Sequence, residues 1–266
     1  MISRSSVRLS NDVYRACYHH ALSTQSQEIV GLLIGQVEND IIDIFALKIV
    51  KRLDKKQDRV EISDEQLMET MTYTEELKAK LNKPGLNVVG WYHSHPNITV
   101  WPSHVDLKTQ FSYQRMSQDW IGLIFAVFNK EKVQKSYKYE LVAFQACPDQ
   151  LGNLSRITLP IEVVKENNLM PEEHVLAEMT KLSDILLEET KESAYDAMEG
   201  EDYLTSLKRD LGIITSFPLI FLNCKLFFRV LAIQSGHVQI LENLTIPTSE
   251  QLQLEKALIE AKEEVG

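Results

Sequence analysis

The sequence predicts an α/β domain, and two observations lead to that prediction. Short runs rich in β-branched and aromatic residues alternate with segments whose apolar residues recur at helical spacing. Residues 120–128 form a near-continuous apolar run, which is typical of a central strand covered on both faces. Strands that alternate with helices predict a sheet with helices packed against it, in a domain that ends near Asn168.

The expected elements follow from where such segments begin and end. Two helix starts show the capping-box pattern, in which a serine precedes a glutamine or an acidic residue by three positions. In chain order, the elements are a helix over 10–22, strands over 28–36 and 40–50, a helix from 63 to the Pro84-Gly85 stop, a strand over 86–92, a helix over 103–118, and strands over 120–128, 137–146 and 155–164. The turn 37–40 joins the first two strands, and the charged stretch 51–60 is expected to be a solvated loop.

From Pro171 onward the pattern becomes helical. An apolar stripe at helical spacing comprises Val175, Met179, Leu182, Leu186 and Thr190. Residues 249–265 predict a second helix with a similar stripe, and each stripe either packs on the chain's own core or pairs with another chain. The run 211–233 is long enough to span a bilayer, but Lys225 and Arg229 would each cost about 2.5–3.5 kcal/mol there. We therefore interpret that run as buried in a soluble protein.

The composition narrows the functional classes. A formal net charge of −10 argues against a nucleic-acid-binding protein, which usually has an excess of basic residues. The 3 cysteines are widely spaced and fit neither a disulfide framework nor a zinc-cysteine motif, which indicates a reducing compartment. The polar residues 1–11 do not form a signal peptide, so we expect a protein that is not secreted.

The stretch between residues 90 and 106 carries the strongest functional signal. His93 and His95 follow an apolar run that predicts a buried strand, and residues two apart on a strand point to the same face, about 6.5–7 Å apart. Asp106 adds a carboxylate oxygen from the segment that follows. Three protein ligands and one open position are what a catalytic zinc requires. A lone His-x-His pair is more often a pair of satisfied polar residues, so it is the combination that predicts a metal site.

Two further candidates have a structural alternative beside a catalytic role. Ser103 and Asp106 form a capping-box pattern, which would start a helix whether or not Asp106 binds a metal ion. Glu28, at the start of a predicted strand, is the candidate to take a proton from an attacking water and deliver it to a leaving amine. A glutamate at a strand start is also common on surfaces, and nothing in the sequence alone places Glu28 near the histidines.

Together these residues resemble the motif of the JAMM, or MPN-plus, metalloproteases. The matching positions are Glu28, His93, His95, Ser103 and Asp106. The resemblance implies a cytidine-deaminase-like mixed sheet flanked by helices, with a C-terminal helical extension, and hydrolysis of isopeptide bonds to ubiquitin-like proteins. It also implies one Zn2+ per chain held by His93, His95 and Asp106, with Glu28 as the general acid and base. Ser103 is then expected to stabilise the tetrahedral intermediate.

A longer similarity over residues 90–106, continuing to Phe125, resembles one branch of that family, the deubiquitinase subunits of the BRISC and BRCA1-A assemblies. This similarity covers about residues 1–210 and implies action on lysine-63-linked ubiquitin chains in the cytoplasm and nucleus. It implies an MPN-minus partner of the Abraxas type, in a dimer of heterodimers, and no direct contact with nucleic acid or membrane. We expect a catalytic domain over 1–170 and a helical extension over 171–266 that binds the partner.

Two alternatives stay open at this level. An MPN domain that serves as a non-catalytic scaffold would share the fold, although a complete set of ligands argues against it. A JAMM enzyme for another ubiquitin-like modifier would share the motif, because the motif contacts only the bond being cut. Asn97 stands where relatives often have histidine, but it lies outside the ligand pattern.

Overall fold

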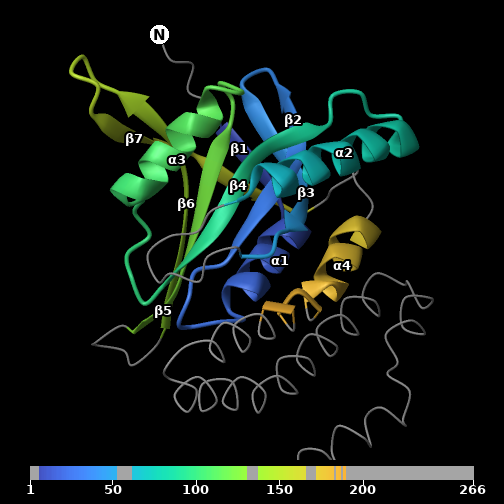
Figure 1. Cartoon of the computed structure of the whole chain (residues 1–266), viewed down its shortest axis with the longest axis horizontal. Coiled ribbons are helices and arrows are strands. Elements are labelled where there is room, and N and C mark those ends of the chain that lie inside the picture. The colour runs from blue at the N-terminus through green and yellow to red at the C-terminus, as the bar shows by residue number, and fades with distance from the viewer. Residues whose placement is uncertain are drawn as a thin grey trace, which may run out of the picture. The chain divides into compact units, whose positions relative to one another are not determined.

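The computed structural model describes residues 6–52, 62–130, 137–165, 172–182, 184–186 and 188–189. Its elements, in chain order, are β1 (Ser6–Ser10), α1 (Asn11–Ala21), β2 (Val30–Glu38), β3 (Ile41–Ile49), α2 (Asp64–Leu81), β4 (Asn87–Pro96), α3 (His104–Gln114), β5 (Ile121–Lys130), β6 (Tyr137–Pro148), β7 (Leu154–Leu159), β8 (Ile161–Val164) and α4 (Glu172–Thr180). The α/β class predicted from the sequence is confirmed, and the helices pack around a twisted mixed sheet (Figure 1). The short strand β1 was not predicted.

The strands form one sheet in the order β7-β6-β5-β4-β2-β3-β1-β8. β4 lies inside the sheet, parallel to β5 and antiparallel to β2. The single strand predicted over 155–164 is wrong, because Pro160 divides it into β7 and β8, which pair at opposite edges of the sheet. Proline lacks the N–H group that a strand ladder requires. Since one residue separates two edge strands, the sheet has to curl until its edges approach one another.

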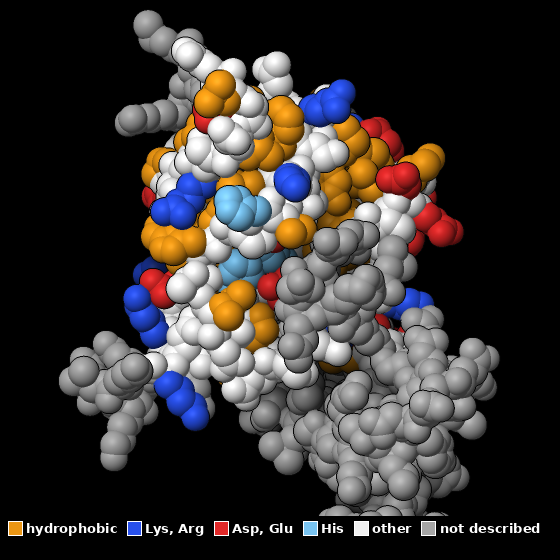
Figure 2. Space-filling model, turned by 60° about the vertical axis from the view of Figure 1, so that its left-hand side comes forward, with side chains coloured by type: hydrophobic (Ala, Val, Ile, Leu, Met, Phe, Trp, Pro, Cys, Tyr) orange, Lys and Arg blue, Asp and Glu red, His pale blue; other side chains and the backbone are white. Residues whose placement is uncertain are grey.

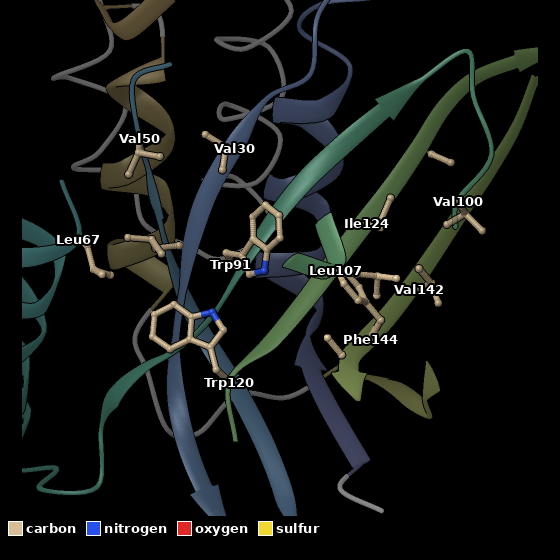
Figure 3. Packing of buried hydrophobic residues seen from close by; sticks show 13 residues of the cluster. Val30, Val50, Leu67, Trp91, Val100, Leu107, Trp120, Ile124, Val142 and Phe144 are labelled. Carbon is tan, nitrogen blue, oxygen red and sulfur yellow. The ribbon is translucent and has the colours of Figure 1, made fainter. Parts of the chain in front are cut away.

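Helices cover both faces of this sheet (Figure 1). α2 and α3 contribute to a hydrophobic cluster around Trp91 of β4, in which aliphatic and aromatic side chains from the strands interlock (Figure 3). α1 packs on the opposite face, where His20 lies 2.9 Å from the hydroxyl of Tyr92. Because side chains alternate along a strand, His93 and His95 share the Trp91 face with α2 and α3.

Helix starts follow the prediction more closely than helix ends do. Ser10 caps α1 by accepting a hydrogen bond from a backbone N–H, and Ser63 and Gln66 form both halves of the capping box of α2. α2 ends before the predicted Pro84-Gly85 stop, because Asn82 adopts the left-handed conformation with φ of 51°. α3 ends at residue 114, four residues earlier than predicted.

Most of the described part of the apolar stripe after Pro171 is buried by the chain itself, and Leu186 is half-buried. α4 packs against β3 and α1 (Figure 1). The buried apolar residues of this segment are Val175, Leu176, Met179 and Leu182. Packing on the chain's own core, one of the two alternatives that the sequence leaves open, is therefore the correct one for these four residues. Residues 191–266, with the run 211–233, the helix predicted over 249–265 and Cys224, lie outside the described residues.

The charged stretch predicted as a solvated loop is buried at Arg52. Arg52 is 8% exposed and forms an ion pair with Glu189, which is 3% exposed. The prediction is therefore wrong for Arg52, while residues 53–61 lie outside the described part of the chain. Among the described residues, no helix is both long and apolar enough to cross a membrane.

Candidate metal centre

β4 presents two histidines side by side in the interior. His93 and His95 are 0% and 3% exposed, and their Nε2 atoms lie 3.2 Å apart. Trp91, two residues earlier on the same face, stacks on the ring of His93 with the ring centroids 4.5 Å apart. The spacing that predicts one shared face thus brings the two imidazoles together, and the indole fixes the plane of the first.

The start of α3 brings a carboxylate to the same point. Asp106 is 8% exposed, and its Oδ1 lies 3.5 Å from His93 Nε2 while its Oδ2 lies 3.6 Å from His95 Nε2. The three side chains form a group whose ligand atoms all lie within 4.8 Å of one another. On the surface, histidine and acidic side chains lie next to each other on one face of the molecule (Figure 2).

The donor set fits the requirements of a tetrahedral metal ion. Zinc bonds of about 2.0–2.2 Å to nitrogen and oxygen place neighbouring ligand atoms about 3.3 Å apart, close to the separations among these three side chains. His95 Nδ1 lies 2.6 Å from the backbone oxygen of Thr99. A carbonyl only accepts hydrogen bonds, so Nδ1 carries the proton and Nε2 keeps a lone pair for a metal ion. This group can therefore hold a metal ion.

The electrostatics of the group favour an ionised carboxylate. Burial raises the pKa of Asp106, but the neighbouring His93 and hydrogen bonds from His93, His95 and Ser103 outweigh it and hold that pKa well below its usual range. Burial lowers the pKa of His95, but Asp106, the Thr99 carbonyl and Glu28 together raise it above its usual value. The negative side chains thus attract positive charge, which a bound cation supplies in place of a proton.

Glu28 lies beside this group, a proximity that the sequence could not establish. It is 6% exposed, and its Oε1 is 3.9 Å from His95 Nε2. The residue after it, Ile29, exchanges two hydrogen bonds with Ser94, because the Ile29 N–H donates to Ser94 Oγ at 3.0 Å and the Ser94 N–H donates to the Ile29 carbonyl at 3.1 Å. Ser94 stands between the two histidines, so the main chain at Glu28 is tied directly to the strand that carries them.

Ser103 occupies the N-cap of α3. Its Oγ accepts a hydrogen bond from the Asp106 N–H at 3.1 Å, and its own N–H donates to Asp106 Oδ2 at 2.6 Å. The predicted capping box is therefore present. Asp106 takes part in the cap and lies against the histidines at the same time, so the structural and the metal-binding interpretation of this residue are compatible.

The chain matches one family model and many relatives. Residues 3–119 match the family described as JAB1/Mov34/MPN/PAD-1 ubiquitin protease. A protein named Lys-63-specific deubiquitinase BRCC36 from Camponotus floridanus is 43% identical over 205 residues, which cover 77% of this chain and 78% of the relative.

The chain belongs to the JAB1/Mov34/MPN/PAD-1 family.

A second relative of the same name, from Xenopus tropicalis, is 38% identical over 205 residues, covering 76% of this chain and 77% of the relative. Among solved structures, protein DSY2949 from Desulfitobacterium hafniense is similar with a TM-score of 0.41 and 18% identity, over 61% of this chain and 95% of that chain. The family model and the two relatives confirm the resemblance to JAMM proteases that the sequence motif predicts.

Three residues that hold the candidate centre in place were not predicted from the sequence. Ser94 ties the Glu28 segment to β4, and the Thr99 carbonyl selects the tautomer of His95. Gln110 of α3 accepts a hydrogen bond from Trp91 Nε1 at 2.8 Å and donates to the Trp120 carbonyl at 2.7 Å, which fixes α3 against the sheet. No spacing rule marks these residues, because each acts through a partner that only the fold supplies.

Proposed function

We propose that this chain is a zinc-dependent deubiquitinase that hydrolyses isopeptide bonds in lysine-63-linked ubiquitin chains. The observation that carries the proposal is the convergence of His93, His95 and Asp106, with Glu28 3.9 Å from His95. Metal-assisted hydrolysis requires three protein ligands that leave one position open, with a group nearby that can transfer a proton. The relatives named Lys-63-specific deubiquitinase support the substrate class and the linkage.

The residues of this chain take separate parts in the reaction. His93 Nε2, His95 Nε2 and a carboxylate oxygen of Asp106 would hold the zinc, which when bound polarises the scissile carbonyl and lowers the pKa of water to about 7. Glu28 accepts the proton of the attacking water at a carboxylate oxygen and donates it to the lysine Nζ as that amine leaves. Ser103 donates a hydrogen bond from its hydroxyl to the developing oxyanion, an interaction worth about 2.7–4 kcal/mol in hydrolases.

The partner and the compartment belong to the same proposal. An MPN-minus subunit of the Abraxas type would join this chain in a dimer of heterodimers, in the cytoplasm and nucleus. The catalytic domain comprises residues 1–170, and the extension 171–266 would bind the partner. Because the apolar residues of α4 are already buried, the surface for that partner is expected elsewhere in the extension.

Metal content and turnover of two variants test the proposal. Purified chain should hold close to one zinc, which His95→Ala should lose. Glu28→Gln should keep the zinc and the fold but lower turnover of lysine-63-linked ubiquitin about 100- to 10,000-fold, the range for a general acid–base group. Zinc quantification and cleavage of a panel of linkage-defined chains are the measurements, with and without a partner subunit.

Three outcomes would contradict it in different ways. Absence of zinc and of cleavage would favour the scaffold alternative. Cleavage of another modifier in preference to ubiquitin would correct the substrate. Unchanged turnover in Glu28→Gln would mean that another residue transfers the proton.

A further inference from the structure

Arg52 connects the candidate catalytic centre to the segment that follows α4. This side chain is 8% exposed and lies between the end of β3 and the start of β2. Its backbone N–H donates to Glu189 Oε1 at 2.8 Å, its Nε donates to Glu189 Oε2 at 3.0 Å, and a terminal guanidinium nitrogen also donates to Oε2. The carboxylate of Glu189 therefore fixes both the main chain and the side chain of Arg52, from 137 positions away in sequence.

The other terminal nitrogen of the same guanidinium faces the candidate proton-transfer residue. It donates to Gln27 Oε1 at 2.8 Å and to the backbone carbonyl of Glu28 at 3.4 Å. A guanidinium is planar and offers its donors in a fixed fork. Binding Glu189 on one side of this fork therefore determines where the donors on the other side can point.

The peptide group that follows Glu28 is held at both ends. Its carbonyl accepts the hydrogen bond from Arg52, and its N–H, which belongs to Ile29, donates to Ser94 Oγ at 3.0 Å. A peptide group is planar and includes the Glu28 Cα, so fixing its two ends fixes the point from which the Glu28 side chain leaves the main chain. That side chain ends 3.9 Å from His95 Nε2.

We propose that Arg52 is a positioning residue for Glu28 and that Glu189 holds Arg52 in place. The segment after α4 then sets the geometry of proton transfer without contacting the substrate. The inference rests on the proposed function, in which Glu28 transfers the proton. Any partner that binds this segment, or any change that displaces Glu189, would alter turnover through Arg52.

A second ion pair between the same parts of the chain supplies a matched control. Glu178 of α4 lies 3.4 Å from Lys48 of β3, and it is 1% exposed. Glu178→Gln and Glu189→Gln each neutralise one buried carboxylate that joins the C-terminal segment to β3 or to the residues after it. Only Glu189 acts on the arginine that bonds to Glu28.

The experiment compares these two variants with wild type in the full chain. Hydrogen exchange of the peptide containing residues 27–30 is measured in the metal-free and the zinc-loaded chain, together with zinc content, kcat and KM for lysine-63-linked diubiquitin. We expect Glu189→Gln to speed exchange at residues 27–30 and to lower kcat about 10- to 100-fold, with KM within about twofold and zinc retained, because a small misplacement of a catalytic group costs about that much. Glu178→Gln should keep both exchange and kcat close to wild type.

Arg52→Lys provides a milder variant if Glu189→Gln does not fold. It keeps the positive charge beside Glu189, but an ammonium group lacks the fork that reaches Glu28. It should therefore lower kcat and speed exchange at residues 27–30 while keeping most of the stability.

The outcomes separate this inference from the proposed function. Unchanged exchange at residues 27–30 in both Glu189→Gln and Arg52→Lys would overturn the link through Arg52, and equal losses of kcat in Glu178→Gln and Glu189→Gln would reduce it to a general effect on stability. Unchanged turnover in Glu28→Gln would overturn the role of Glu28 itself, while the exchange data would still decide whether Glu189 orders its main chain.

Discussion

Helices α2 and α3 both begin with a capping box, but only the box of α3 also contributes a residue to the candidate metal centre. In α2, Ser63 Oγ accepts from the Gln66 N–H at 3.0 Å, and Gln66 Oε1 accepts from the Ser63 N–H at 3.1 Å. In α3, Ser103 and Asp106 make the equivalent pair at 3.1 and 2.6 Å. The remaining polar atom of Gln66 donates to a backbone carbonyl, whereas Asp106 also faces two histidines.

The difference shows how little has to change for a structural element to become functional. Both boxes satisfy backbone N–H groups that a helix start leaves unpaired, so both contribute stability. A carboxylate in place of an amide adds a charge, and the direction of α3 brings that charge to β4. The cap holds the candidate ligand Asp106 in place at the start of α3.

Exchanging the residue three positions after each cap serine, Gln66 in α2 and Asp106 in α3, should produce the largest change in zinc binding and turnover. Asp106→Gln keeps a capping-box residue but removes the charged ligand, so we expect zinc affinity to fall by more than about 100-fold, beyond the loss typical of residues that only orient a ligand. Cleavage of ubiquitin chains should then be undetectable. Metal quantification after dialysis and a cleavage assay measure the two losses.

Gln66→Asp is the matched control, because aspartate keeps an oxygen that can accept the Ser63 N–H and adds a negative charge at a cap that is not part of the candidate metal group. It should keep zinc and turnover at wild-type values. Full zinc occupancy in Asp106→Gln would show that the carboxylate belongs to the cap alone.

The two cap serines provide the next comparison. Removing either hydroxyl should cost about 1 kcal/mol of unfolding free energy, the usual loss for an N-cap. Ser103→Ala should in addition lower kcat about 100- to 1,000-fold, the usual loss for one oxyanion donor, whereas Ser63→Ala should leave kcat unchanged. Thermal melting and steady-state kinetics of both variants are the measurements.

Asparagine separates the two roles of Ser103, because it caps a helix as well as serine does. Ser103→Asn should restore the melting temperature but not kcat. Full recovery of kcat would contradict a catalytic role for the hydroxyl.

The dependence of the melting temperature on pH should reveal a smaller difference between the two capping boxes. In the metal-free chain, burial lowers the pKa of His95, but Asp106, the Thr99 carbonyl and Glu28 raise it above the ordinary value of 6.5. The proton on His95 therefore stabilises the metal-free fold below about pH 6.5, and this stability is lost as the pH rises through the folded pKa. Zinc requires an unprotonated Nε2, so its affinity should rise by up to about tenfold per pH unit while that proton has to be displaced.

The gap in melting temperature between zinc-loaded and metal-free chain should accordingly widen from pH 6 to pH 8. Asp106 does not oppose this trend, because its pKa lies well below that range and it stays ionised throughout. The cap of α2 has no titrating group and should contribute equally at each pH. A constant gap would mean that no proton leaves His95 when zinc binds.

The sequence predicts what depends on neighbours along the chain. Both capping boxes, the alternation of strands and helices, and the residues of the candidate centre follow from local spacing, and the structure brings those residues together. The failures concern partners that are distant in sequence. Arg52 looks like part of a charged loop until Glu189, 137 positions later, neutralises it. The division at Pro160 depends on which strands lie at the sheet edges, and no periodicity contains that information.

The spacing of the candidate ligands also bears on how the centre forms. His93 and Asp106 stand thirteen positions apart, whereas Glu28 is 67 positions before His95. Bringing Glu28 to His95 closes a longer loop than bringing His93 to Asp106, and its entropic cost in free energy is larger by about 1.5 kcal/mol. The three metal-holding candidates can therefore meet within one contiguous stretch, whereas the contact between Glu28 and His95 depends on the pairing of β2 with β4. Metal content alone would consequently report the arrangement of β4 and α3, and turnover is needed to report the position of Glu28.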